Sequence, residues 1–276
     1  MESRIARVIL RFWVAGVLAF LFIPIATIVL FAFDRSNVLA WPIHHFSTKW
    51  FSVAWHDPQV RAALILSLKA GAIATAIALL LGSAAAFGVY RFRFFGRETI
   101  SLLLVLPIAL PGIITGIALN SAFSFAGINL SLWTIVIGHA TFCVVVVYNN
   151  VIARLRRTSS SLSEASMDLG ADGLQTFRYV MLPTLSTALI SGALLAFALS
   201  FDEVIVTTFT AGAQNTLPLW VFGAIRLGQQ LPEVNVVVTF VLAVTAIPVA
   251  IAARLTGARG LTRSSAAAVS EPDQAA

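Results

Sequence analysis

The chain has 276 residues, of which 59% are hydrophobic and only 11% charged, with a mean hydropathy of +0.92 and a formal net charge of +6. A soluble domain carries about a quarter charged residues, so this composition excludes an ordinary water-soluble fold. The length fits one membrane domain of several helices, and the single cysteine, Cys143, excludes an intrachain disulfide.

Six apolar stretches are long enough to cross a bilayer, which takes roughly 20 residues. We therefore predict an all-α membrane protein with six transmembrane helices. The predicted spans cover residues 8–33, 62–90, 100–123, 132–148, 185–209 and 234–253. The fourth span is short and the second is long, so we expect tilt or extension into the interface there.

The first span resembles a signal peptide, because Arg4, Arg7 and Arg11 precede its apolar run. However, the run exceeds the ~7–15 residues of a signal core, and no A-x-A-like cleavage site follows it. We therefore expect a retained helix.

Basic residues gather on one side of the predicted spans. Thirteen of the 18 lysines and arginines lie on that side: Arg4, Arg7, Arg11, Arg91, Arg93, Arg97, Arg154, Arg156, Arg157, Arg178, Arg254, Arg259 and Arg263. Because Lys and Arg accumulate on cytoplasmic loops, both termini are predicted to be cytoplasmic. We expect residues 1–260 to form the transmembrane domain and residues 261–276, rich in Ser and Ala, to be a disordered cytoplasmic tail.

The first outer loop, about residues 34–59, contains Trp41, Trp50 and Trp55. These side chains fit an interfacial aromatic belt, and docking of an external partner is the alternative. The loop's histidines, His44, His45 and His56, lack the spacing of a metal site, so we interpret them as surface residues.

The third span contains Pro107, Pro111 and Gly112, which predict a kink because proline removes a helical hydrogen bond. Such a broken helix lines a cavity in many transporters, although a static packing kink explains it equally. Charged residues within spans are costly and usually functional. They are Lys69, which could snorkel or form an ion pair, and Asp202 with Glu203, which could line a cation pathway, face the outer water or pair with Lys69.

The loop at about residues 158–183 is polar and patterned for two short helices. Ser161 and Glu164 have the spacing of a capping box at a helix start. Gly170 is placed to end that helix. Asp172 begins a second helix with Gln175 three residues later, and Pro183 fits the start of the next span. Such a projection from a membrane protein suggests either an ordinary structured loop or a docking element for a cytosolic protein.

This loop resembles the signature of the permease subunits of binding-protein-dependent ABC importers. That pattern reads E-A-A, three residues, G, nine residues and I-x-L-P. The chain carries Glu164-Ala165-Ser166, then Gly170, then Val180-x-Leu182-Pro183 at the same spacing. Ser166 and Val180 depart from the pattern conservatively. The resemblance implies the type I importer fold and a coupling helix that docks on an ATPase subunit. The expected coupling residues are Glu164, Ala165, Ser166, Met167, Asp168, Leu169, Gly170, Leu182 and Pro183.

The resemblance extends along nearly the whole chain. The segments "SFDEVIVTTFTAG" and "TLPLWVFGAIRLGQQLPEVNVVVT" resemble the spermidine/putrescine permease branch. A polyamine is a flexible polycation, so its pathway needs carboxylates and aromatic faces. We expect these from Asp202, Glu203, Phe201, Trp220 and Phe222.

The chain has no Walker A motif and no nucleophile–base pair, since Ser121 and His139 are isolated in the sequence; His139 could still face the interior of the bundle. We therefore expect no enzyme activity, no metal and no bound cofactor, with ATP and magnesium held by a partner ATPase dimer. The other implied partners are a homologous permease subunit, an extracytoplasmic binding protein and the bacterial inner membrane, with no nucleic acid. The alternatives are a self-contained secondary transporter or channel, and an importer permease for another small compound.

Overall fold

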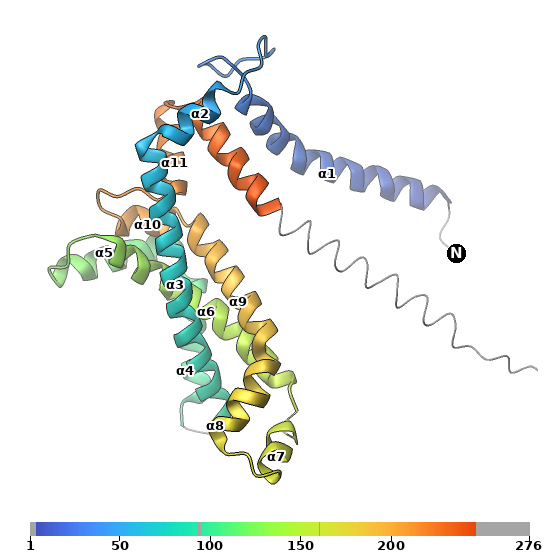
Figure 1. Cartoon of the computed structure of the whole chain (residues 1–276), viewed down its shortest axis with the longest axis vertical. Helices are drawn as coiled ribbons and strands as arrows, with labels where there is room; N and C mark the ends of the chain where they lie inside the picture. Colours follow the sequence, from blue (N-terminus) through green and yellow to red (C-terminus); the bar gives the residue numbers. More distant parts are fainter. Residues whose placement is uncertain (1–3, 93–94, 160, 247–276) are drawn as a thin grey trace, which may run out of the picture. The chain divides into compact units, whose positions relative to one another are not determined.

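The computed structural model describes residues 4–92, 95–159 and 161–246, and these residues are almost entirely helical (Figure 1). The helices are α1 (Arg4–Ala32), α2 (Lys49–His56), α3 (Pro58–Arg91), α4 (Arg97–Ala109), α5 (Gly112–Phe125), α6 (Leu132–Arg157), α7 (Ser161–Asp168), α8 (Gly173–Thr176), α9 (Leu182–Asp202), α10 (Ile205–Thr210) and α11 (Leu217–Leu227). A π-helical turn, η1 (Phe177–Met181), precedes α9, and a further apolar helix covers Leu231–Ala246. This architecture confirms the all-α prediction.

The chain divides into two units, residues 58–223 and residues 1–57 with 224–276. The larger unit is built on α3, α6 and α9, which lie side by side (Figure 1). Their shared core is made of small and branched apolar side chains: Ala78, Ala86, Val89, Cys143, Val147, Tyr148, Val151, Ile152, Leu155, Leu185 and Ala196. Small residues allow helices to approach closely, which is how helices associate when lipid is the solvent.

The third predicted span is broken rather than gently kinked. Helices α4 and α5 meet at an angle of 102° across Leu110 and Pro111. Leu110 and Pro111 have extended backbone, as expected for a proline and the residue before it. The predicted kink is confirmed, and α5 packs against the short helix α10.

Two predicted span boundaries were wrong. The fourth span is not short, since α6 continues as far as Arg157, well beyond residue 148. The fifth span ends at Asp202, and Phe209 belongs to the separate helix α10. In both cases the apolar run in the sequence did not show where the helix ends. Charged residues can extend a helix beyond the apolar run, as in α6, and a helix break can lie within the run, as after α9.

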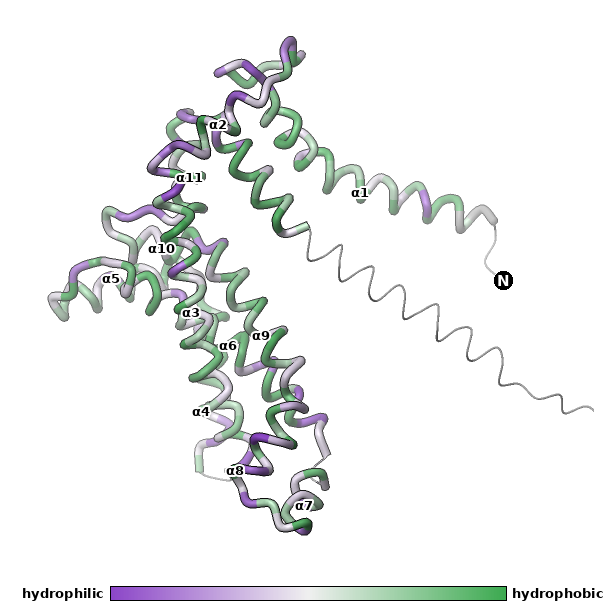
Figure 2. The backbone as a smooth tube through the Cα atoms, in the orientation of Figure 1, coloured by the Kyte–Doolittle hydropathy of each residue, from purple (hydrophilic) through white to green (hydrophobic). Residues whose placement is uncertain are grey.

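Most basic residues of the larger unit gather at one end. Arg91 ends α3, Arg97 begins α4, and α6 ends with Arg154, Arg156 and Arg157. The loop α7–α8 lies at the same end, where hydrophilic segments replace the apolar colour of the spans (Figure 2). The positive-inside rule predicts that this end is cytoplasmic. Asp202 and α10 then lie at the outer end.

The smaller unit contains α1, the outer loop, α2 and the helix Leu231–Ala246. None of the residues in the most apolar stretch of α1 is buried, as expected for a helix surrounded by lipid or other subunits. The helix Leu231–Ala246 covers the first part of the sixth predicted span, while residues 247–253 and the predicted tail at 261–276 lie outside the described residues. The six-span count, the domain division and the cytoplasmic termini stay predictions.

Candidate functional site

The turn between α7 and α8 is a helix stop built on Gly170. Gly170 has φ of +88°, and its N–H donates to the carbonyl of Met167 at 2.9 Å. The N–H of Ala171 donates to the carbonyl of Ser166 at 3.1 Å. These two bonds define a Schellman motif with glycine at its left-handed position. The predicted helix-ending role of Gly170 is therefore confirmed.

The start of α8 is capped as the sequence predicts. The Gln175 backbone N–H donates to Oδ1 of Asp172 at 2.8 Å, and the Asp172 N–H donates to Oε1 of Gln175 at 2.9 Å. Reciprocal bonds of this kind form a capping box. Helix α8 then passes into η1 and α9 without a gap, with Leu182 and Pro183 at the start of α9.

The predicted capping box at the start of α7 was wrong. Ser161 is the first residue of α7 and not the residue before it, and its N–H donates to Oγ of Ser159 at 3.3 Å. Glu164 instead lies exposed in the first turn of α7. A carboxylate there favours the helix through the macrodipole. The S-x-x-E spacing alone could not distinguish a cap from a position one residue inside the helix.

Helix α7 is tied to the segment that leads into α9. The Ser166 and Thr176 hydroxyls share a hydrogen bond of 3.1 Å, and the Ser163 hydroxyl donates to the sulfur of Met181 at 3.3 Å. Ser166, the departure from the family's alanine, thus serves a local contact. These two contacts join α7 to the end of α8 and to η1.

The far side of this loop is exposed and partly apolar. Leu169 is 90% exposed and Leu174 is 75% exposed. Around them lie Glu164, Ala165, Met167 and Asp168, all exposed. We name the set Glu164, Met167, Asp168, Leu169 and Leu174 the docking surface. Two strongly exposed leucines on one loop make this surface a candidate for contact with another protein.

The two acids at the outer end of α9 have different environments. Asp202 is exposed, and it is the last residue of α9. Glu203 is partly buried, and its Oε1 accepts a hydrogen bond from the N–H of Val206 at 2.9 Å. That bond satisfies a free amide at the start of α10, which is a helix-capping role.

The aromatic residues proposed for the pathway do not share one environment. Phe201 stacks on Phe197 within α9, with ring centroids 6.0 Å apart. Trp220 is only 5% exposed and lines a hollow of about 340 Å³ beside Gln59, Gln214 and Asn215. Phe222 is 51% exposed on α11.

Lys69 is exposed on α3, and in the described part of the chain no ion pair joins it to Asp202 or Glu203. An exposed lysine on the bundle surface is consistent with snorkelling. The alternative that Lys69 neutralises the two acids is therefore not supported.

His139 faces the interior of the bundle, as the sequence allowed, but sequence reasoning missed its partners. This residue is 1% exposed on α6, and its ring nitrogens bond the hydroxyls of Ser200 on α9 and Thr207 on α10, at 2.7 Å and 2.8 Å. A helical histidine with no charged partner in the sequence gives no signal for contacts that lie 61 and 68 residues away. Only the packing of three helices reveals them.

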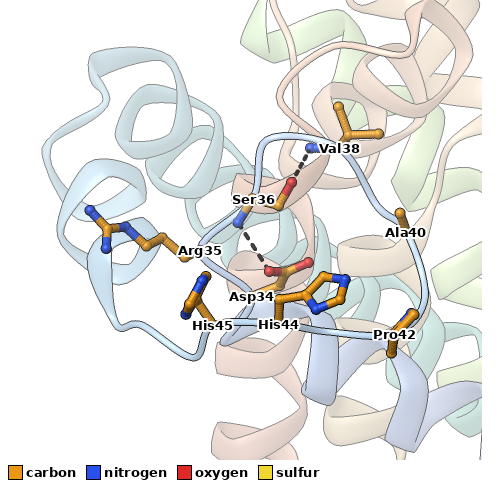
Figure 3. A pocket seen from close by; sticks show the side chains of 8 residues that line it. All are labelled: Asp34, Arg35, Ser36, Val38, Ala40, Pro42, His44 and His45. Atoms are coloured by element: carbon orange, nitrogen blue, oxygen red, sulfur yellow. Dashed lines mark hydrogen bonds between the residues drawn. The ribbon is translucent and has the colours of Figure 1, made fainter.

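The outer loop folds over a hollow of about 300 Å³ lined by polar and small residues (Figure 3). The Asp34 carboxylate accepts from the N–H of Ser36 at 3.0 Å, and the Ser36 hydroxyl accepts from the N–H of Val38. His44 and His45 lie in this loop, but among the described residues no group of three His, Cys, Asp or Glu side chains is arranged to hold a metal ion.

Apolar spans, one basic end and a projecting, partly apolar loop are features of a membrane permease. Residues 78–259 match the family described as binding-protein-dependent transport system inner membrane component. The chain belongs to this family, the permeases of ABC importers, and is a multi-pass protein of the inner membrane. Such permeases bind no cofactor and are not enzymes.

The chain is similar to several curated permeases over most of its length. It is 35% identical over 232 residues to the putrescine transport system permease protein of Escherichia coli K12, covering 81% of this chain and 82% of that one. It is 32% identical over 247 residues to the spermidine/putrescine permease of the same organism, covering 89% and 92%. These similarities confirm the family resemblance and the branch.

The fold is shared with solved importers. A bacterial ABC transporter involved in the import of alginate matches with a TM-score of 0.65 at 17% identity, over 93% of this chain and 98% of that chain. At this identity the match shows the fold alone, and it confirms the type I importer permease architecture.

Proposed function

We propose that this chain forms half of the substrate pathway of an ATP-driven importer for polyamines such as putrescine and spermidine. It works with a homologous second permease, two ATPase subunits that hold ATP and magnesium, and an extracytoplasmic binding protein. The relatives named above support the substrate class. An exposed carboxylate, Asp202, directly after Phe201 at the outer end of α9 offers the chemistry that a passing ammonium group needs.

The docking surface is the observation that carries the ATP-driven part of this proposal. Its two leucines are among the most exposed apolar side chains of the cytoplasmic end. Glu164 and Asp168 add negative charge beside them, so the fitting partner presents an apolar groove edged by basic groups. The ATPase subunit is the partner that a member of this family meets there.

Coupling would run from the docking surface along one continuous path. Closing of the ATPase subunits on ATP displaces α7. The bonds of Ser166 to Thr176 and of Ser163 to Met181 then pull on η1. Because η1 continues directly into α9, that helix moves as a rod, and its outer end lies about 28 Å from Pro183 at a rise of ~1.5 Å per residue.

The test is uptake by the reconstituted four-subunit complex in vesicles loaded with ATP. Labelled putrescine and spermidine are offered with the binding protein, beside an uncharged sugar and a neutral amino acid. The proposal expects polyamine uptake that stops when the ATPase subunits cannot hydrolyse ATP. Uptake without the ATPase would favour a secondary transporter, and uptake of another solute alone would overturn the substrate class.

A further inference from the structure

His139 joins three helices at the outer end of the bundle. Its ring lies between α9 and α10, 2.7 Å from the Ser200 hydroxyl and 2.8 Å from the Thr207 hydroxyl. Ser200 is 3% exposed and Thr207 is completely buried. A wholly buried polar cluster of this kind is expensive unless each member is hydrogen-bonded, and here each one is.

The directions of these hydrogen bonds follow from counting hydrogens. Thr207 Oγ1 donates its only hydrogen to the carbonyl of Glu203 at 2.7 Å. It must therefore accept from Nε2 of His139, which carries the ring hydrogen. In the neutral ring Nδ1 is then an acceptor, and Ser200 donates to it. Every hydrogen bond from Ser200 to the Glu203 carbonyl is thus made with a neutral imidazole ring.

The last bond of this chain lies at the break between α9 and α10. Glu203 has an extended backbone, with φ −73° and ψ 118°, and it ends α9. Its carbonyl accepts a hydrogen bond from the Thr207 hydroxyl, and its side chain accepts one from the N–H of Val206. The position of the break is thus set by contacts that lead back to His139.

Helix α10 is held at its other end as well. The Thr134 hydroxyl shares its hydrogen between the carbonyls of Thr210, at 2.7 Å, and Ser131, at 2.8 Å. The Asn120 amide donates to the carbonyl of Phe209 at 2.7 Å. The carbonyls of Phe209 and Thr210 are at the C-terminal end of α10, where no helical partner remains. Helix α10 is therefore clasped by α5 and α6, and His139 on α6 bonds both α10, through Thr207, and α9, through Ser200.

We propose that His139 is a positioning residue for transport, which carries the displacement of α9 into α10 and so into the outer end of the pathway. The inference rests on the proposed function, because α9 is the rod that begins at the docking surface. Glu203 and Val204 join the two helices covalently, and a two-residue connection can pivot. In the absence of the His139 link, α9 would still move with the ATPase, while the contacts with α5 and α6 would hold back the far end of α10.

The rival explanation is a histidine that only fills the core. The two ideas differ in what a conservative change should do. Thr207→Val keeps the shape of the side chain but removes the hydroxyl that joins His139 to Glu203, whereas Thr207→Ser keeps the hydroxyl. A filler role predicts that both variants affect complex yield alone. The positioning role predicts that Thr207→Val loses coupling and Thr207→Ser restores it.

The experiment measures motion of α10 in the complete importer, independently of the substrate. Thr208 is exposed on α10, and the one native cysteine of this chain is buried, so Thr208→Cys gives a single reactive reporter on this chain. The importer without the Thr208→Cys change gives the background labelling of the other subunits. The reporter's rate of modification by a thiol reagent is measured with and without ATP, in the Thr208→Cys parent and with Thr207→Val or Thr207→Ser added. We expect ATP to change this rate in the parent and in the Thr207→Ser variant, and to leave it unchanged with Thr207→Val.

Uptake and ATP hydrolysis by the same Thr207 variants, without the reporter, form the second arm. We expect Thr207→Val to hydrolyse ATP within about twofold of wild type and to lose at least about tenfold in polyamine transported per ATP, which corresponds to ~1.4 kcal/mol. An ATP response of the reporter that is equal in all three backgrounds, or absent from the parent, overturns the inference. Failure of the wild-type complex to take up any polyamine overturns the proposed substrate instead, and the reporter arm still decides the role of the His139 cluster.

Discussion

Gly82 of α3 lies directly against the backbone of Val144 on α6. A Cβ at position 82 would be 2.7 Å from the Val144 carbonyl oxygen and 3.1 Å from the N–H nitrogen of Tyr148. Real Cβ atoms do not approach a carbonyl so closely, and a backbone atom cannot rotate away as a side chain can. The spacing between the two central helices of the bundle is therefore set by the absence of a side chain at this position.

Gly82→Ala is expected to destabilise the permease by about 1–3 kcal/mol, the usual cost of overpacking a tight core. The measurement is the thermal unfolding midpoint of the purified complex in detergent, together with its yield. Gly88→Ala is the matched control on the same helix, since a Cβ there would meet nothing within 4 Å. Equal midpoints for the two variants would show that α3 and α6 can separate freely.

Gly170→Val should impair transport more than Gly170→Ala. The space around Gly170 is open, so the strain comes only from φ of +88°. A left-handed residue costs roughly 1–2 kcal/mol for a residue with a Cβ and more for a β-branched one. Uptake and ATPase activity of the assembled complex provide the measurement. Gly173→Ala, where φ is not positive and the space is also open, should behave as wild type; equal activity of both Gly170 variants would contradict the prediction.

The cytoplasmic loop was the most predictable part of the chain, because its structure is local. The stop at Gly170 and the box between Asp172 and Gln175 depend on residues three to five positions apart. Residues that are so close in the sequence must also be close in the structure. The start of α7 was misplaced by one residue, because a serine gives the same sequence pattern whether it is the N-cap or the first residue of the helix.

Glu164→Lys should uncouple ATP hydrolysis from uptake. The substitution places a positive charge in the first turn of α7, which the helix dipole disfavours by about 0.3–1 kcal/mol, and it reverses a charge of the docking surface. Asp168→Lys separates the two effects, because the dipole favours a cation at the last residue of α7. If docking charge matters, both variants lose binding to the ATPase in a pull-down assay. A Glu164→Lys complex with normal uptake would remove this residue from the coupling site.

The outer end of the bundle could be predicted only in part. The sequence indicated that Asp202 and Glu203 are unusual, because they are acids at the end of an apolar run. It could not show that a helix break separates their roles, nor that His139 on α6 reaches Thr207 on α10. Those contacts depend on how α6, α9 and α10 pack, and packing of apolar helices leaves little periodic signal in a chain that is apolar on most faces.

The two outer acids should therefore respond differently to mutation. Asp202→Asn removes an exposed charge, and among the residues that the structure describes no hydrogen bond of the Asp202 side chain is found, so the change is expected to lower polyamine uptake several-fold with normal complex yield. Glu203→Gln keeps an oxygen that can accept from Val206, and its effect on yield should be small. Glu203→Ala loses that cap, which typically costs ~0.5–2 kcal/mol, and should lower the yield itself.

Uptake and yield must be measured together, in buffers of low and high salt, since screening weakens an exposed carboxylate's pull on a cation. If Asp202 guides the substrate, high salt should reduce wild-type uptake more than uptake by Asp202→Asn. If Asp202→Asn, Glu203→Gln and the double mutant all take up polyamine at the wild-type rate, both acids are excluded from the pathway. A loss of uptake and yield confined to Glu203→Ala would assign Glu203 to the α9–α10 break alone. The groups that bind the cation would then lie elsewhere in the bundle.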